Sequence, residues 1–320
     1  MKRVIRYEVT TESDGMLVKE ILHRHFGLST RQVSRLKFHP EGILVDGGHV
    51  TVRHVLRTGQ VLTLCLETEE EGSDHLEPVE GPLDIRYEDP DMLLLHKPAG
   101  VVVHPSHGHY NDSLANMLVY HYQQQGQHLV VRPVGRLDKD TSGLIIVAKH
   151  AAASAIFDRQ RRHDQLGRTY LALVEGCPSP RSGTIQAPIG RVDDSLILRQ
   201  VRPDGETACT DYQVLCAGTD YSLVQLKLHT GRTHQIRVHM AHLGHPLLGD
   251  PFYGTEGSFG MHRAALHSWQ IHCLHPITGE AMHFVADLPE DMTRLCLEAG
   301  FSLPAPSEHS SHDPFPSSTL

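Results

Sequence analysis

The chain has 320 residues, of which 39% are hydrophobic and 21% are charged. This composition is typical of a soluble globular protein, long enough for two domains or one large one. Its net charge of −9 argues against a nucleic-acid partner unless positive charge is gathered locally. No apolar run approaches the ~20 residues that cross a bilayer, and the N-terminus has no signal-peptide core.

Cysteine usage and charge distribution refine this picture. The six cysteines are scattered without a Cys-x-x-Cys pair, which indicates reduced thiols in a cytoplasmic protein. Acidic residues are concentrated between Glu67 and Glu80, and four arginines gather between Arg159 and Arg168. The negative net charge therefore does not describe every part of the surface.

The first 66 residues alternate between strand and helix patterns. Residues 1–10 predict a strand, and residues 14–26 a helix. Ser29 or Thr30 is a suitable cap for a second helix over residues 31–37. Three further strands are predicted at residues 42–46, 50–52 and 60–64, the first of them followed by a Gly-Gly pair suited to a hairpin turn.

This helix–helix–hairpin order resembles the small αL RNA-binding domain first known from a ribosomal protein. The resemblance implies that Arg31 and Arg35 lie on an RNA-facing side. The alternative is a small α/β domain with a solvated polar face, since charged runs are usually surface. Residues 67–82, acidic and containing Gly and Pro, have the composition of a linker.

From residue 83 onward the pattern is richer in strands. Short apolar runs at residues 85–89, 92–96 and 101–104 are separated by turn residues, and Lys97 lies in one of these turns. Lys97 is either a turn lysine that points to solvent or, by the resemblance below, a support of the active-site floor. Asn111 or Asp112 is a suitable cap for a helix that runs through Tyr122.

The segment Val134–Lys149 reads VGRLDKDTSGLIIVAK and places a polar loop before a buried strand. Asp138 lies on that loop, and functional side chains favour such places. The alternative is an aspartate that only shapes a turn. A helix at residues 151–162 and a strand at residues 168–176, which carries Tyr170, come next; a tyrosine on a strand usually packs in a core.

The last third contains two predicted strands, at residues 207–215 and 222–228, and then the string TGRTHQIRVHMA from Thr230. Thr230 or Thr233 is a suitable cap for a helix whose first turns carry His234 and Arg237. The pattern ends with Arg263–His267, a strand through Phe284, and a tail rich in Ser, Pro and His that is typical of disorder.

The string Arg-Leu-Asp-x-x-Thr-Ser-Gly-Leu at Arg136 resembles the motif around the catalytic aspartate of the RluA-type pseudouridine synthases. The turn at Lys97, the strand with Tyr170 and the long string from Thr230 match the same family in the same order, over residues 83–290. Two positions depart from its pattern. Gly135 stands where the family usually has His, and Arg168 stands where it usually has Lys.

The resemblance implies an RNA uridine isomerase that needs no cofactor and no metal. Asp138 would be the catalytic carboxylate, attacking the sugar or the uracil ring or promoting elimination, with Arg237 as its salt-bridge partner. Tyr170 would stack on the uracil and take a proton. The target base must leave its stack. Three further arginines would contact the substrate: Arg136, Arg232 and Arg263.

Three other functions remain open. A metal enzyme is suggested by two histidine clusters, although neither has the His-Glu-x-x-His pattern; their members are His104, His107, His109, His239, His242 and His245. A glycosidase needs two carboxylates that flank a bond, and Asp140 is too close to Asp138 on one loop. A non-catalytic RNA-binding protein would not need Asp138, Tyr170 and Arg237 together.

We therefore predict an α+β protein whose catalytic domain has a mixed, largely antiparallel sheet flanked by helices. The expected divisions are a small αL RNA-binding domain at residues 1–66, a linker at 67–82, a catalytic domain at 83–299 and a disordered tail at 300–320. We expect a cytoplasmic monomer that acts on RNA and has no membrane partner. Large-subunit ribosomal RNA is the favoured target, and tRNA is the alternative.

Overall fold

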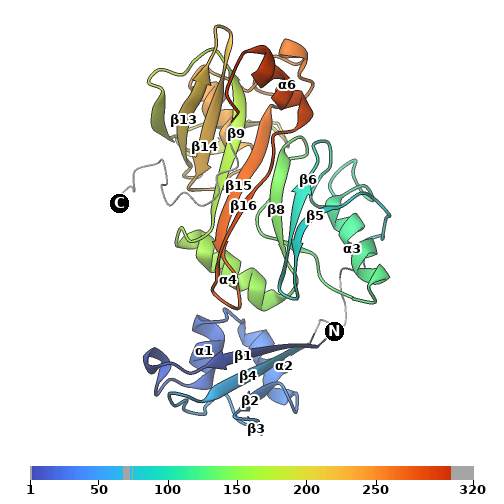
Figure 1. Cartoon of the computed structure of the whole chain (residues 1–320), viewed down its shortest axis with the longest axis vertical. Helices are drawn as coiled ribbons and strands as arrows, with labels where there is room; N and C mark the ends of the chain where they lie inside the picture. The colour runs from blue at the N-terminus through green and yellow to red at the C-terminus, as the bar shows by residue number, and fades with distance from the viewer. Residues whose placement is uncertain (1, 68–72, 74, 304–320) are drawn as a thin grey trace.

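The computed structural model describes residues 2–67, 73 and 75–303, which form two main sheets with helices around them (Figure 1). The predicted tail from residue 304 lies outside the described residues, as do residues 68–72 and 74 of the predicted linker. Between these gaps, Ser73 is buried and its hydroxyl accepts a hydrogen bond from the Val131 amide. This part of the predicted linker is therefore packed against the larger part of the chain.

The small N-terminal module is a four-stranded antiparallel sheet with strand order β1-β4-β2-β3. Its helices begin where the sequence supplies caps: the Ser29 hydroxyl accepts a hydrogen bond from the Gln32 amide at the start of α2, as predicted. The elements are β1 (Lys2–Glu8), η1 (Thr11–Ser13), α1 (Val18–Arg24), α2 (Thr30–Phe38), β2 (Ile43–Val45), β3 (Gly48–His49) and β4 (Val61–Glu67).

Three local predictions for this module were wrong. The helix expected at residues 14–26 begins only at Val18, because Gly15 has a positive φ of 76° and breaks the helical path before it. The hairpin turn is Asp46-Gly47 rather than the Gly-Gly pair, since Val45 pairs with Gly48. Residues 50–52 form no strand.

The large sheet has strand order β10-β13-β14-β9-β15-β8-β6-β5, with β16 beside β15 and β7 beside β8. Among the strands of the described residues, only the β15–β8 pair is parallel, which confirms the predicted mixed, largely antiparallel sheet. Its strands are β5 (Asp84–Glu88), β6 (Met92–Lys97), β7 (Arg132–Pro133), β8 (Ser142–Ala148), β9 (Gly167–Glu175), β10 (Ser182–Gln186), β13 (Cys209–Ala217), β14 (Tyr221–Leu228), β15 (Leu266–Leu274) and β16 (Ala281–Val285).

Helices flank this sheet, and a separate ribbon of β11 (Ile189–Arg191) and β12 (Arg199–Val201) lies outside it. The helices are α3 (Leu114–Gln124), α4 (Ala151–Arg162), α5 (Gln235–His242), η2 (Ser258–Gly260) and α6 (Glu290–Glu298). The α3 cap is Ser113 rather than Asn111 or Asp112, and residues 101–104 form no strand. Phe301, assigned by the prediction to the tail, is buried against the α6 side of the sheet.

Helix α4 joins the two parts of the molecule, as Figure 1 shows. Ala152 and Ile156 on α4 belong to the same buried cluster as the apolar residues of the small module. The Arg159 guanidinium donates hydrogen bonds to the carbonyl oxygens of Arg24 and His25, just where α1 ends. The small module therefore completes its core with residues of the larger part.

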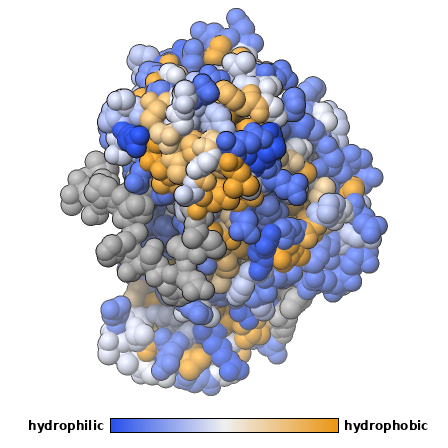
Figure 2. Space-filling view, turned by 45° about the horizontal axis from the view of Figure 1, so that its top comes forward, coloured by the Kyte–Doolittle hydropathy of each residue, from blue (hydrophilic) through white to orange (hydrophobic). Residues whose placement is uncertain are grey.

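The surface shown in Figure 2 is hydrophilic along its edges, while hydrophobic residues gather over the upper central part of that face. None of the helices within residues 2–67 and 75–303 has the length and apolar character needed to span a membrane.

Candidate active site

Asp138 lies on the loop between β7 and β8, and its side chain is 16% exposed. Two cations approach it without closing to hydrogen-bond distance. Arg136 Nη2 lies 3.7 Å from Asp138 Oδ1, and Arg237 Nη1 lies 3.9 Å from Asp138 Oδ2. The carboxylate therefore sits in positive surroundings and keeps room to meet a further group.

Lys97 holds this loop through hydrogen bonds to backbone carbonyls. It ends β6, is fully buried, and its ammonium group donates hydrogen bonds to the carbonyls of Pro98 and Val101, each at 2.8 Å, and of Lys139 at 3.0 Å. Burial lowers the pKa of Lys97 to about 7, against the charges of Asp140 and Asp138, which raise it. The solvent-facing alternative for Lys97 was wrong, because its side chain supports the Asp138 loop.

Arg263 supports the other side of the same loop. Its Nη1 donates to the carbonyl of Asp140 at 3.0 Å and also to that of Leu266. Its Nε and Nη2 hold both oxygens of Asp291, at 2.7 and 2.9 Å. These internal partners give Arg263 a structural role, and the phosphate contact expected of it stays a prediction.

Arg237 projects from α5 and is buried against an aspartate that the sequence reasoning missed. Its Nε and Nη2 bind the two oxygens of Asp250 at 2.7 and 2.6 Å, and Asp250 is fully buried. Burial disfavours the cation, but the hydrogen bond to Asp250 and the charges of Asp250 and Asp138 outweigh it, so the pKa of Arg237 lies above its usual value. Asp250 thus orients the guanidinium that approaches Asp138.

Aromatic rings complete the setting of Arg237. Its guanidinium carbon lies 5.2 Å from the ring centroids of both Phe252 and Tyr253. His234 precedes α5 with a positive φ of 59°, and its Nδ1 is 2.8 Å from the Tyr253 hydroxyl. His234 is therefore the N-cap residue of α5, where Thr230 or Thr233 was expected, and burial lowers its pKa.

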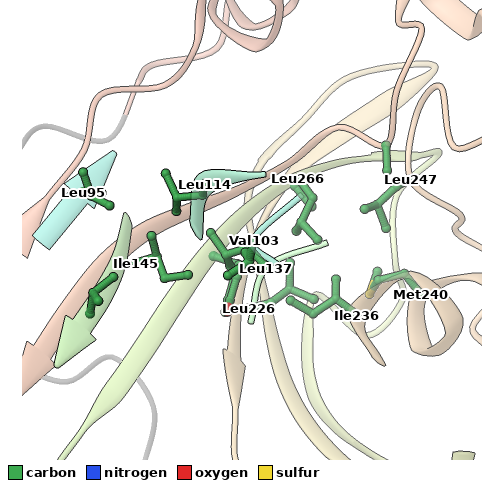
Figure 3. Packing of buried hydrophobic residues seen from close by; sticks show 14 of the residues in the cluster. Leu95, Val103, Leu114, Leu137, Ile145, Leu226, Ile236, Met240, Leu247 and Leu266 are labelled. Atoms are coloured by element: carbon green, nitrogen blue, oxygen red, sulfur yellow. The ribbon is translucent and has the colours of Figure 1, made fainter. Parts of the chain in front are cut away.

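Tyr170 lies on β9 between Leu226 of β14 and Ser268 of β15, and Ser268 in turn pairs with Gly143 of β8. Tyr170 is buried, with 3% of its surface exposed. It belongs to the same apolar cluster as Leu137 and Ile236, which directly precede Asp138 and Arg237 in the chain. Figure 3 shows Leu137, Leu226 and Ile236 packed side by side. The structure thus gathers Asp138, Tyr170 and Arg237 around one region.

The other predicted substrate contacts differ in position. Arg136 is the most open of those near Asp138, with 63% of its side chain exposed. Arg232 donates hydrogen bonds to the Thr207 carbonyl and to Glu206. Arg31 and Arg35 of α2 instead line a groove of ≈ 970 Å³ between the small module and the residues that follow β8. Since β8 has seven residues at ~3.3 Å each, that groove is about 20 Å from the Asp138 end.

Neither predicted histidine cluster forms a group that could hold a metal in the described part of the chain. His239 contacts the Thr210 hydroxyl and the Ala187 carbonyl, and His245 the Glu175 carbonyl. Two other groups bring three potential ligand atoms within 4.8 Å of one another: Cys209, Asp211 and His229, and Asp89, Asp91 and His275. In both groups the aspartates are already hydrogen-bonded to protein side chains.

Comparison with known proteins agrees with this geometry. A family model described as RNA pseudouridylate synthase matches residues 91–242, which include Asp138, Tyr170 and Arg237. The uncharacterized RNA pseudouridine synthase YjbO of Bacillus subtilis is 45% identical over 282 residues, covering 88% of this chain and 98% of YjbO. Ribosomal large subunit pseudouridine synthase D of Haemophilus influenzae is 36% identical, covering 90% of this chain and 92% of that protein.

Solved structures show the same fold. Human RNA pseudouridylate synthase domain containing 1 superimposes with a TM-score of 0.54 and 26% identity, covering 72% of this chain and all of that chain. Human RNA pseudouridylate synthase domain containing 4 also superimposes with a TM-score of 0.54, at 24% identity. This chain therefore belongs to the RNA pseudouridine synthase family, and it is an isomerase that converts uridine in RNA into pseudouridine.

Proposed function

We propose that Asp138 is the catalytic carboxylate of this isomerase and that Arg237 orients it. The observation that carries the proposal is the buried Asp250–Arg237 pair, whose free edge faces Asp138 at 3.9 Å. A neighbouring guanidinium that is itself held by a buried aspartate fixes the direction of the carboxylate that it faces. Asp138 acts on the ribose or on the uracil ring, or promotes elimination.

The reaction breaks the bond between the ribose C1′ and the uracil N1, turns the base, and forms a bond from C1′ to C5. The proton that leaves C5 is balanced by the one gained at N1, so no oxidant or cosubstrate is needed. Tyr170 lies against the base, and its phenolic oxygen takes the C5 proton as its own proton is released toward N1, which regenerates the phenol. Its hydroxyl makes no hydrogen bond with another described residue. Arg136, exposed beside Asp138, contacts the strand from which the uridine is extruded.

The substrate we propose is large-subunit ribosomal RNA, with tRNA as the second candidate. Several relatives carry the name ribosomal large subunit pseudouridine synthase D, including that of Haemophilus influenzae. The small module, residues 1–66, binds RNA through Arg31 and Arg35, which line the groove beside it. The protein acts as a cytoplasmic monomer, with a catalytic domain at residues 83–299.

Replacement of Asp138 by Asn tests the assignment. Tritium release from RNA labelled at uracil C5 should fall by roughly 10³-fold or more, as for other nucleophile replacements, while RNA affinity is retained. Asp140→Asn, on the same loop, is the matched control and should keep most of the activity. Undiminished release from Asp138→Asn would refute the role. Mapping pseudouridines in total RNA from cells with and without the gene distinguishes ribosomal RNA from tRNA.

A further inference from the structure

The two positions at which this chain departs from the usual family pattern contact each other in space. Gly135 has a positive φ of 84°, and a Cβ built on it would lie 2.6 Å from Arg168 Nη1. This is closer than two such atoms approach, so a side chain at residue 135 would move the guanidinium end of Arg168 from its present position. Gly135 and Arg168 therefore form one structural unit.

The Arg168 guanidinium has no counterion within the described part of the chain. It makes no hydrogen bond or ion pair with any other described residue, although its side chain is half-buried. On its other side, a Cβ built on Gly231 would lie 3.7 Å from Arg168 Nη2. The guanidinium thus reaches from the Asp138 loop to the loop that leads into α5.

The position of Arg168 connects it with the reacting end of the molecule. It precedes Tyr170 by two residues on β9, so the two side chains leave the strand on the same side. It lies beside the loop that carries Arg136 and Asp138 and next to Gly231, the neighbour of Arg232. A half-buried guanidinium in this setting favours an anion with two acceptor oxygens.

We propose that Arg168 binds a phosphate of the RNA strand next to the extruded uridine, in the space that Gly135 leaves open. This inference rests on the proposed function and adds a substrate contact to it. Because a planar guanidinium holds a phosphate through two parallel N–H donors, Arg168 fixes the position of the strand while Asp138 reaches the nucleotide. A lysine in the same place would supply charge without the fork.

The first test measures RNA affinity for Arg168→Gln at several salt concentrations, with a fluorescein-labelled RNA stem-loop that has uridines in its loop as the probe. Loss of one phosphate contact should reduce the slope of log K against log salt by about 0.7–0.9. Arg294→Gln is the control, since Arg294 pairs with Glu298 on α6, and should leave the slope unchanged. An unchanged slope for Arg168→Gln would overturn the proposal.

The second test is a double-mutant cycle. Gly135→His alone should raise KM at least tenfold, because the imidazole displaces the Arg168 guanidinium. Adding Arg168→Lys, which restores the usual family pair, should recover a large part of that loss. Strictly additive effects in soluble, folded variants would contradict the coupling. Repeating the salt series in an Asp138→Asn background separates failure of this contact from failure of the catalytic assignment, because binding does not depend on turnover.

Discussion

The charged side chains near the two ends of β8 differ in how closely they are paired. Just beyond its last residue, Lys149 binds Glu88 at 2.8 Å, and Asp91 is held by both His150 at 2.9 Å and Arg3 at 2.6 Å. At its first residues, Asp138 stands 3.7 and 3.9 Å from its arginines, and Arg168 has no counterion among the described residues. One end satisfies its charges internally, whereas the charged groups at the other end have no close partners among the described residues.

The closely paired end is where the small module contacts the larger part, and the other end carries Asp138. The pair of Arg3 and Asp91 fixes the small module to the larger part. Burial raises the pKa of Asp91, but its hydrogen bonds with His150 and Arg3 outweigh burial and bring the pKa to about 2. At the start of β8 the supporting groups are satisfied instead: Lys97, Arg263 and Asp250 all have complete sets of internal partners. Asp138 and Arg237 are therefore held by neighbours that are themselves fixed.

The largest effect is expected from Asp250→Ala at the reacting end. Removing one member of a buried pair leaves Arg237 as an uncompensated charge, so the free energy of unfolding should fall by about 3–5 kcal/mol. The turnover number should fall as well, because Arg237 loses its orientation. Urea unfolding and tritium release measure the two effects.

The matched control for Asp250→Ala is Asp291→Ala. Asp291 is also held by two guanidinium nitrogens, but its side chain is 39% exposed. Its removal should therefore have a smaller effect on stability. Equal losses for the two variants would show that burial does not distinguish these pairs.

A smaller effect is expected from Lys97→Met, at about 1–3 kcal/mol, because buried carbonyls lose their donor. The loss should depend on pH. Burial lowers the folded-state pKa of Lys97 to about 7 from 10.5, so between these values the unfolded chain binds more protons than the folded one. The free energy of unfolding of the wild type, relative to Lys97→Met, should rise with pH across this window, by at most about 1.4 kcal/mol per pH unit.

Urea unfolding of both proteins at pH 6, 8 and 9.5 measures this difference. A gap that stays constant over this pH range would mean that Lys97 keeps its charge in the folded protein throughout, so that burial does not lower its pKa.

The smallest effect is expected at the docking end from Arg3→Ala. Asp91 keeps His150 as a partner, so the loss should be near the low end of the ~1.5–3 kcal/mol typical of hydrogen bonds to charged groups. Hydrogen exchange of β1 and β4 amides should show faster opening of the small module. Arg6→Ala is the control, because Arg6 also lies on β1 but its side chain is exposed. The amides of this variant should exchange at the wild-type rate. Equal exchange in both variants would exclude a docking role for Arg3.

The sequence predicted the fold best where local pattern and tertiary position agree. The helix at residues 151–162 and the strand over β8 were placed correctly, because an apolar period and clear end signals mark both. The strand predicted at residues 101–104 does not form. The backbone carbonyls of this segment accept hydrogen bonds from Lys97 and from the start of α3 rather than from a neighbouring strand. Such long-range partners leave no local period in the sequence.

The sequence predicted that three of the proposed site residues come together, but it did not predict the aspartate that holds Arg237. The motifs placed Asp138, Tyr170 and Arg237 in one site, but Asp250 was missed although it lies in the Gly-Asp-Pro stretch after α5. Its role depends on a contact across 13 positions that only the fold creates. An acidic residue within an otherwise apolar and glycine-rich stretch is the signal that would have indicated it. The contact of Gly135 with Arg168 likewise joins positions 33 apart and has no local trace.

Shared packing at α4 means that the two parts of this protein cannot be separated cleanly. A cut in the segment between residues 67 and 82 would expose Ala152 and Ile156 to water on one fragment. On the other fragment it would expose the apolar side chains of the small module that pack against them. Either fragment would be prone to self-association. Experiments on RNA recognition by this enzyme should therefore keep the chain whole and change single side chains.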